Sequence, residues 1–136
     1  MAAIAATAAR IARVFPQTDE VYNFICGVAV TAGQAVHVNS SGNLILSNAG
    51  ASGTAKCVGI ALENGGIGQA ISVMKTGLIA GFTLSGAYGS KAYLSDVAGG
   101  LDDGAGTVSV VLGSILSLAD ASRTKVLFID ANWSAI

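Results

Sequence analysis

The residues able to do acid–base or nucleophilic chemistry are few and far apart in this chain. Its 136 residues include one histidine, His37, and two cysteines, Cys26 and Cys57. A catalytic nucleophile needs a base and an orienting partner, and histidine is the commonest base near neutral pH. His37 alternates with Val36 and Val38, which favours a packing or surface role on a strand over a catalytic one. We therefore expect no enzyme and no catalytic residue.

Ligands for a metal or a cofactor are equally scarce. One histidine and two isolated cysteines do not supply the four ligands of a closed zinc site. Asp96, Asp102 and Asp103 gather in one glycine-rich connection that offers oxygen ligands to calcium, but the EF-hand pattern is missing, so a solvated turn is favoured. Residues 65–68 are glycine-rich but open no helix, which argues against a phosphate loop. No metal and no cofactor is expected.

The composition points to protein partners. Charged residues make up 11% of the chain, against about 25% in a typical soluble domain, so much of the surface is expected to be covered by protein and the chain to be a homo-oligomer. The few cations pair only at Arg10 with Arg13 and at Arg123 with Lys125, which disfavours direct nucleic-acid binding. The sequence has no apolar run of about 18 residues, so no membrane span is expected. Free buried thiols are favoured, with a disulfide left open.

Two parts of unlike character follow each other. Residues 1–20 are rich in alanine and lack glycine, and Ile4, Ala8, Ile11 and Phe15 recur at helical spacing. A helix this short is marginal alone, so residues 1–20 are predicted to be a docking arm that needs a partner. Arg10 and Arg13 follow the apolar stretch, the wrong order for a secretion signal. Residues 21–136 are predicted to form the body.

The body has the alternating pattern of a β protein. Glycine-punctuated runs at residues 21–26, 35–38, 44–46, 57–62, 69–74, 78–84, 91–94, 107–112 and 125–130 predict short strands. Asn64-Gly65 predicts a tight reversal, because this pair adopts positive φ at low cost. Many short strands without a long helical period indicate an all-β fold, a small antiparallel barrel or sandwich.

The body also contains an internal sequence repeat at a nearly constant offset. Residues 33–38 match residues 89–94, and residues 58–62 match residues 112–116. The offsets are 56 and 54 residues, and Gly42 matches Gly99 at 57. A repeated period of this kind predicts two similar β units. Nothing chemically reactive recurs with them, so the repeat predicts a scaffold.

The ordered series of strand residues and structural glycines resembles a known family. Residues 32–36, 58–62 and 68–73, then Gly77, Gly81-Phe82, and residues 92–96 with 99–101, are similar to the small capsid decoration, or cement, proteins of tailed bacteriophages. The resemblance covers about residues 21–130. It implies a β-rich, tulip-like or jelly-roll-like body on the outside of an expanded phage head, without catalytic residues.

The same resemblance implies the partners. Such proteins bind the major capsid protein at junctions between capsomers, as trimers or in some relatives as dimers, so a homotrimer made in the host cytoplasm and carried on the virion is expected. A terminal arm often crosses a neighbouring subunit. The contact residues expected here are Ile4, Arg10, Ile11, Arg13, Val14, Phe15 and Trp133, the last being either a docking anchor or a cap on the body. The alternatives are a head-fibre or tail subunit, or a small-ligand β-barrel protein.

Overall fold

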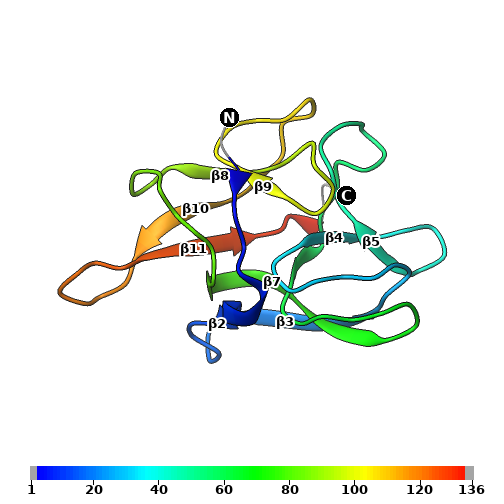
Figure 1. Ribbon diagram of the computed structural model, residues 1–136, viewed down its shortest axis with the longest axis horizontal. Coiled ribbons are helices and arrows are strands. Elements are labelled where there is room, and N and C mark those ends of the chain that lie inside the picture. Colours follow the sequence, from blue (N-terminus) through cyan, green and yellow to red (C-terminus); the bar gives the residue numbers. More distant parts are fainter. Residues whose placement is uncertain (1–2, 134–136) are drawn as a thin grey trace.

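The computed structural model describes residues 3–133, and these form an all-β protein (Figure 1). The strands are β1 (Ala3–Ile4), β2 (Ala12–Arg13), β3 (Glu20–Ile25), β4 (Ala35–Val38), β5 (Leu44–Leu46), β6 (Gly59–Ala61), β7 (Ala70–Ala80), β8 (Lys91–Leu94), β9 (Leu101–Asp102), β10 (Val111–Ser117) and β11 (Lys125–Asp130). All pairs of strands are antiparallel and belong to one folded sheet, which does not close into a barrel. The all-β prediction is confirmed, as a small sandwich.

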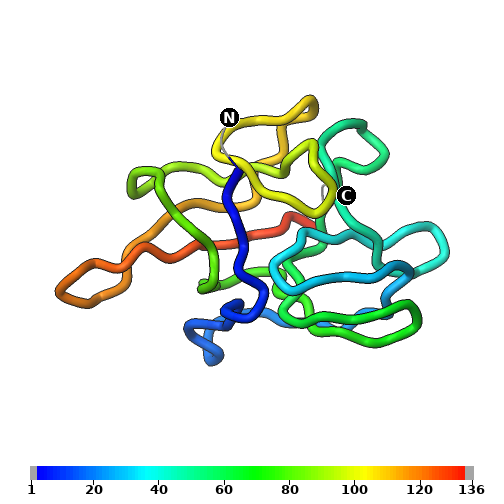
Figure 2. Tube along the Cα trace, in the orientation of Figure 1, coloured from blue at the N-terminus to red at the C-terminus, as the bar shows by residue number. Residues whose placement is uncertain are grey.

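The two predicted units have the same strand pairing. In the first unit β4 pairs with β5 and β6, and β6 pairs with β7; in the second β8 pairs with β9 and β10, and β10 pairs with β11. We call residues 33–80 unit 1 and residues 89–130 unit 2. Figures 1 and 2 show unit 1 on the right and unit 2 on the left and at the top, joined where β11 pairs with the second half of β7.

The register of the two units also matches. Val36 lies opposite Gly59 in unit 1, and Ala92 lies opposite Gly113 in unit 2. Further equivalent pairs are Val38 with Leu44 and Leu94 with Leu101, and then Ile60 with Met74 and Ser114 with Phe128. Since each pair maps onto its counterpart at the offsets seen in the sequence, the repeat is a repeat of structure.

Two glycines explain why the repeat is visible in the sequence. A Cβ on Gly59 would lie 2.1 Å from the carbonyl oxygen of Met74, and one on Gly113 would lie 1.6 Å from that of Phe128. No side chain fits at such distances, so the third strand of each unit needs glycine where it approaches the fourth.

The units stack head to tail around a central core. From unit 1 this core takes Ala35, Ile60 and Met74, which share one face of the sheet. From unit 2 it takes the opposite face, with Ala92, Leu94, Leu101, Leu112 and Leu127. The residues of unit 1 equivalent to these, which include Val36, Leu44, Val58 and Val73, belong to a second core. We call the face that carries Val36 in unit 1 and Ala92 in unit 2 the first face of a unit, and the opposite face the second. The second face of unit 1 thus packs on the first face of unit 2.

The two outward faces of this stack differ in how much of the chain covers them. The first face of unit 1 is covered by the segment from β3 to Val30, with Phe24 and Trp133 packed against the second core. Among residues 3–133 the second face of unit 2 has no such cover around Ser114 and Phe128, although Val126 on the same face of β11 is buried. At the positions of Ala35, Ile60 and Met74 it carries Lys91, Ser114 and Phe128, which are exposed or half-buried. Unit 1 is covered on both faces, whereas unit 2 is open on part of its second face.

The amino-terminal residues close the seam between the units. β1 pairs with β9 of unit 2, Ala6 bridges to Phe82, and β2 pairs with β7 of unit 1. Figure 2 shows this segment in dark blue running across the front of the molecule from one unit to the other. The helical spacing of residues 4–15 does not correspond to an α-helix. Apart from one 3₁₀ turn at Ala8–Arg10, the segment is extended. The backbone groups of Thr7 and β2 bond to β7 and Gly81, which replaces helical hydrogen bonds.

Some strand boundaries differ from the prediction for local reasons. β7 is one strand where the sequence predicts two. It has a bulge beside Lys75, and its first half pairs with β3 and β6 whereas its second half pairs with β2 and β11. Asn64-Gly65 is not the site of positive φ, which is found at Gly68 (φ 85°). Instead, the Asn64 side chain accepts a hydrogen bond from the backbone N–H of Ala32 at 2.8 Å and ties the connection to the body.

Candidate interaction surfaces

The predicted contact residues of the arm divide into buried and exposed ones. Ile4 is 8% exposed and belongs to the central core, and Ile11 packs against that core. Arg10, Arg13 and Phe15 are exposed, Phe15 at 47%. Ile4 and Ile11 thus serve the fold of their own chain, whereas Arg10 and Phe15 are exposed, and Arg13 is exposed but held by Asp19. Whether residues 3–15 also contact a neighbouring subunit stays a prediction.

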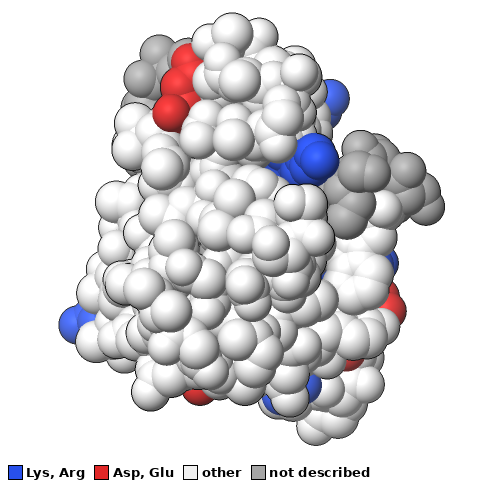
Figure 3. Space-filling view, turned by 90° about the vertical axis from the view of Figure 1, so that its right-hand side faces the viewer, with Lys and Arg blue, Asp and Glu red and all other residues white. Residues whose placement is uncertain are grey.

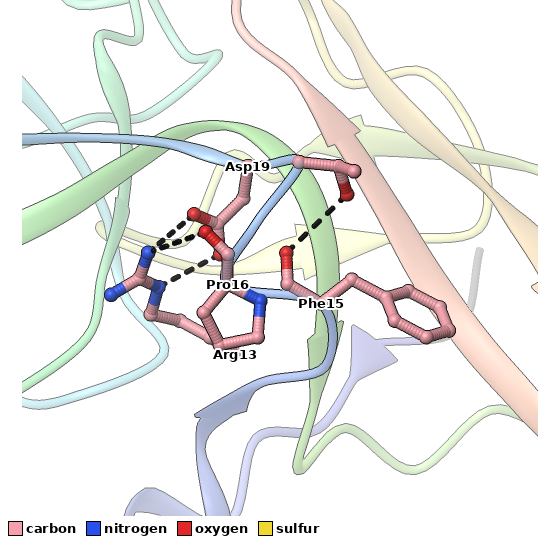
Figure 4. Close-up of polar contacts among 5 residues, drawn as sticks. Arg13, Phe15, Pro16 and Asp19 are labelled. Atoms are coloured by element: carbon pink, nitrogen blue, oxygen red, sulfur yellow. Dashed lines mark hydrogen bonds and ion pairs between the residues drawn. The ribbon is translucent and has the colours of Figure 1, made fainter.

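Arg13 fixes the turn that follows β2. Its guanidinium donates to both carboxylate oxygens of Asp19, at 2.6 and 2.8 Å, and to the carbonyl of Pro16 (Figure 4). The hydrogen bond with Asp19 is the main cause that raises the pKa of Arg13. Thr18 donates a backbone bond to the carbonyl of Phe15 at 3.1 Å, so the turn is braced on both sides. Its geometry leaves the Phe15 ring pointing away from these contacts (Figure 4).

Trp133 is a cap on unit 1. Its indole N–H donates to the carbonyl of Val58 at 2.8 Å, and its ring lies 4.8 Å from that of Tyr22 and 6.3 Å from that of Phe24. The ammonium of Lys75 lies 5.4 Å from the ring centre, a cation–π distance. Trp133 is half-buried, so of the two roles expected for it the cap is the one its contacts fit.

The single histidine and the two cysteines are buried. His37 is 4% exposed, with Nδ1 3.2 Å from Oγ of Ser47, and burial together with the charge of Lys56 lowers its pKa. Cys26 and Cys57 are free and buried in different cores. Burial raises the pKa of Cys57 to about 12, which keeps it a thiol. The expectation of free thiols is confirmed, and the side chain of His37 packs within the fold.

The acidic connection before β10 is a braced turn. Asp96 accepts hydrogen bonds from both the backbone N–H and the hydroxyl of Thr107, each at 2.9 Å. Asp102 is held in β9, paired with Tyr93. Across residues 3–133 no group of three or more His, Cys, Asp or Glu side chains is placed to hold a metal ion. The carboxylate of Asp96 thus serves the loop.

The most distinctive surface is the far end of unit 1. Residues 21–55 contain no Lys, Arg, Asp or Glu, and neither do residues 64–74. The turn 39–43 and the loop 64–69 come from these stretches and lie together at the right of Figure 1; we call them the uncharged end. Figure 3 looks onto this side and shows a broad area free of charged atoms, with the charges towards its margins.

The uncharged end is ordered by its own hydrogen bonds. Asn39 accepts from the backbone N–H groups of Ser41 and Asn43 at 3.0 Å, and Gln69 accepts from that of Gly66 at 2.6 Å. Ile67 belongs to the loop 64–69 and is 78% exposed, the most of any large apolar side chain among the described residues. The signal was present in the sequence as the position of the charge-free stretch, whereas reasoning from the total charge alone missed it.

Neither fold nor sequence leads to a known relative by comparison. No protein-family model, no curated protein and no solved structure matches the chain. No helix among residues 3–133 is long and apolar enough to cross a membrane.

Proposed function

We propose that this chain is a structural virion protein that binds the outside of an expanded phage head and stabilises contacts between capsomers of the major capsid protein. The proposal takes its class from the resemblance of residues 21–130 to capsid decoration proteins. The single observation that carries it is the uncharged end of unit 1, which combines a charge-free surface with an exposed Ile67. A surface without charged groups has no ions to desolvate on docking, which favours a standing protein contact.

The order of the uncharged end supports a role in docking. Its turn and loop are fixed by side-chain bonds of Asn39 and Gln69 to the backbone. A surface that is rigid before binding loses less conformational entropy when it docks, so more of the contact energy is retained as affinity. Because a shell repeats the same site many times, a modest affinity per copy is enough to reinforce it.

A homotrimer is the assembly we propose on the shell, with the exposed Arg10, Arg13 and Phe15 facing a neighbour or the capsid. The low charge of the chain supports assembly into oligomers. A head-fibre or tail subunit is the second candidate, since the same uncharged end suits any permanent contact. A small-ligand protein is less favoured, because the sheet is open and the central core is filled by side chains of both units.

The test is binding to expanded heads by co-sedimentation. Ile67→Asp places a charge in the uncharged end and is expected to weaken binding at least about tenfold, since a carboxylate would be desolvated on docking. Leu116→Asp is the matched control, because Leu116 is 40% exposed on the opposite unit. Equal binding by both variants and the unmodified chain would remove the uncharged end from the proposal. Failure of the unmodified chain to bind would exclude the capsid as its partner.

A further inference from the structure

A groove crosses β10 on the open side of unit 2. Two adjoining hollows, of about 370 and 390 Å³, share Val111, Leu112 and Asn132 as lining. The first extends to Lys56 and to residues 108–110, and the second to Lys91 and Phe128. The strand is bulged here, since its register to β8 shifts between Val111 and Gly113. Val111 is 46% exposed as a result, so the groove has an apolar floor.

One wall of the groove is formed by residues 108–110, which precede β10 and belong to no strand. The N–H of Val108 donates to the carbonyl of Ala49 at 2.8 Å, and the carbonyl of Val110 accepts from the N–H of Leu94 at 2.9 Å. Ser109 lies between them, is exposed, and makes no backbone hydrogen bond to any part of residues 3–133. Ser109 lines the groove, so its backbone has a donor and an acceptor to offer to a ligand there.

The charges of the groove are placed at its ends. Lys56 lies at one end and Lys91 at the other, with the apolar side chains of Val111 and Phe128 between them. The one carboxylate in the lining, Asp130, accepts a hydrogen bond from the hydroxyl of Thr76 at 3.2 Å. In a chain with seven cations, two of them at one groove make a local preference for anionic groups.

We propose that this groove binds an extended segment of a partner protein, in which apolar side chains alternate with acidic ones. The segment adds as a strand along residues 107–111, with the backbone of Ser109 as its hydrogen-bond partner. Its apolar side chains rest on Val111 and Phe128, and its carboxylates reach Lys56 and Lys91. The site differs from the uncharged end, and the proposal holds whether or not the partner is a capsid protein.

The test uses the full-length chain, labelled with ¹⁵N, and a defined probe. The probe is the capped peptide Glu-Val-Glu-Val-Glu-Val, and its control is Lys-Val-Lys-Val-Lys-Val. Titration with the acidic peptide is expected to shift amide resonances of residues 56–57 and 107–113, and the basic peptide to bind more weakly. Lys56→Glu should weaken the acidic peptide by about five- to tenfold, because one attraction becomes a repulsion. Arg123→Glu, which changes an exposed cation on the distant β10–β11 turn, should leave binding unchanged.

A backbone variant separates strand addition from simple charge attraction. Ser109→Pro removes an N–H that the fold does not use, so the chain should stay folded while peptide binding is lost. If Ser109→Pro unfolds, the double change of Lys56 and Lys91 to Glu decides, and it must abolish binding of the acidic peptide. Equal affinity for the two peptides, shifts centred on residues 39–43 and 64–69, or full binding by a folded Ser109→Pro would each overturn the proposal.

Discussion

Unit 1 and unit 2 have the same strands in the same register, but their surroundings differ. Unit 1 lies between the central core and a second core closed by β3 and Trp133. Unit 2 touches the central core with one face, and its other face carries Lys91, Ser114 and Phe128. The same local architecture thus supports a strand that is buried on both faces and one that is half exposed.

The difference follows from how the units are stacked. Two similar units that pack head to tail, rather than back to back, leave two unlike faces at the ends of the stack, as in any heterologous contact. One end is closed by added chain, and the other has polar residues where its partner unit has Ala35 and Ile60. This arrangement stops the stacking at two units and leaves unit 2 with a face on which other groups can bind.

Matched glycine substitutions test whether the two units are held together in the same way. Gly113→Ala and Gly59→Ala should each cost more than about 3 kcal/mol of unfolding free energy, because the new Cβ would overlap a carbonyl oxygen of the next strand. Gly42→Ala is the control: it has φ 84° but nothing within 4 Å, so a cost of about 1 kcal/mol is expected. Urea unfolding measures all three. A loss below 1 kcal/mol for Gly113→Ala would mean that β10 and β11 are further apart than described.

Substitution at one equivalent position tests the difference in cover. Ile60 is 0% exposed, so Ile60→Ala should lose about 2 to 5 kcal/mol. Its counterpart Ser114 lies on the open face, where Ser114→Ala should change stability by less than about 0.5 kcal/mol. Chemical unfolding of both variants decides the matter. Similar losses in the two would show that the second face of unit 2 is covered after all.

Two aromatic residues distinguish the capped end from the open one. Trp133→Ala removes a hydrogen bond to Val58 and a half-buried ring, and a loss of about 2 kcal/mol is expected. Phe128→Ala removes a half-buried ring from the open face and should cost about half as much, because there is no second core to disturb. The thermal midpoints of the two variants give the comparison. The reverse order would contradict the cap.

Acid should weaken unit 1 slightly through His37, whose counterpart in unit 2 is Tyr93. Burial first, and then Lys56, lowers the pKa of His37 in the folded state. The unfolded chain then binds the proton more readily, so stability is complete above about pH 6.5 and is lost as the pH falls through the folded pKa. His37→Gln should remove this part of the pH dependence of the unfolding free energy. An unchanged pH profile in His37→Gln would assign the loss to other groups.

The sequence predicted the parts of the fold that depend on local pattern. The strands at residues 35–38, 44–46, 91–94 and 125–130 are found where alternation and glycine place them. Positive φ at Gly33 and Gly89, and again at Gly42 and Gly99, confirms that the repeated glycines mark repeated turns. These features are visible because each is imposed by the backbone within a few residues.

What the sequence did not predict depends on contacts between distant segments. Ile4 and Ile11 have helical spacing, yet their segment is extended, because β1 pairs with β9 and β2 pairs with β7. The groove at Ser109 arises where a bulge, a loop and Lys56 from the other unit meet, and no local signal marks it. The sequence does not decide whether Trp133 is a docking anchor or a cap, because only the fold brings it to Val58.

The central claim, that the chain decorates a capsid through the uncharged end of unit 1, is tested most directly by cryo-electron microscopy of expanded heads with and without the protein. The account predicts added density on the outer surface at junctions between capsomers, with the turn 39–43 and the loop 64–69 facing the shell. Occupancy should fall in Ile67→Asp and be kept in Leu116→Asp. Heads without added density, or density attached only through unit 2, would contradict it.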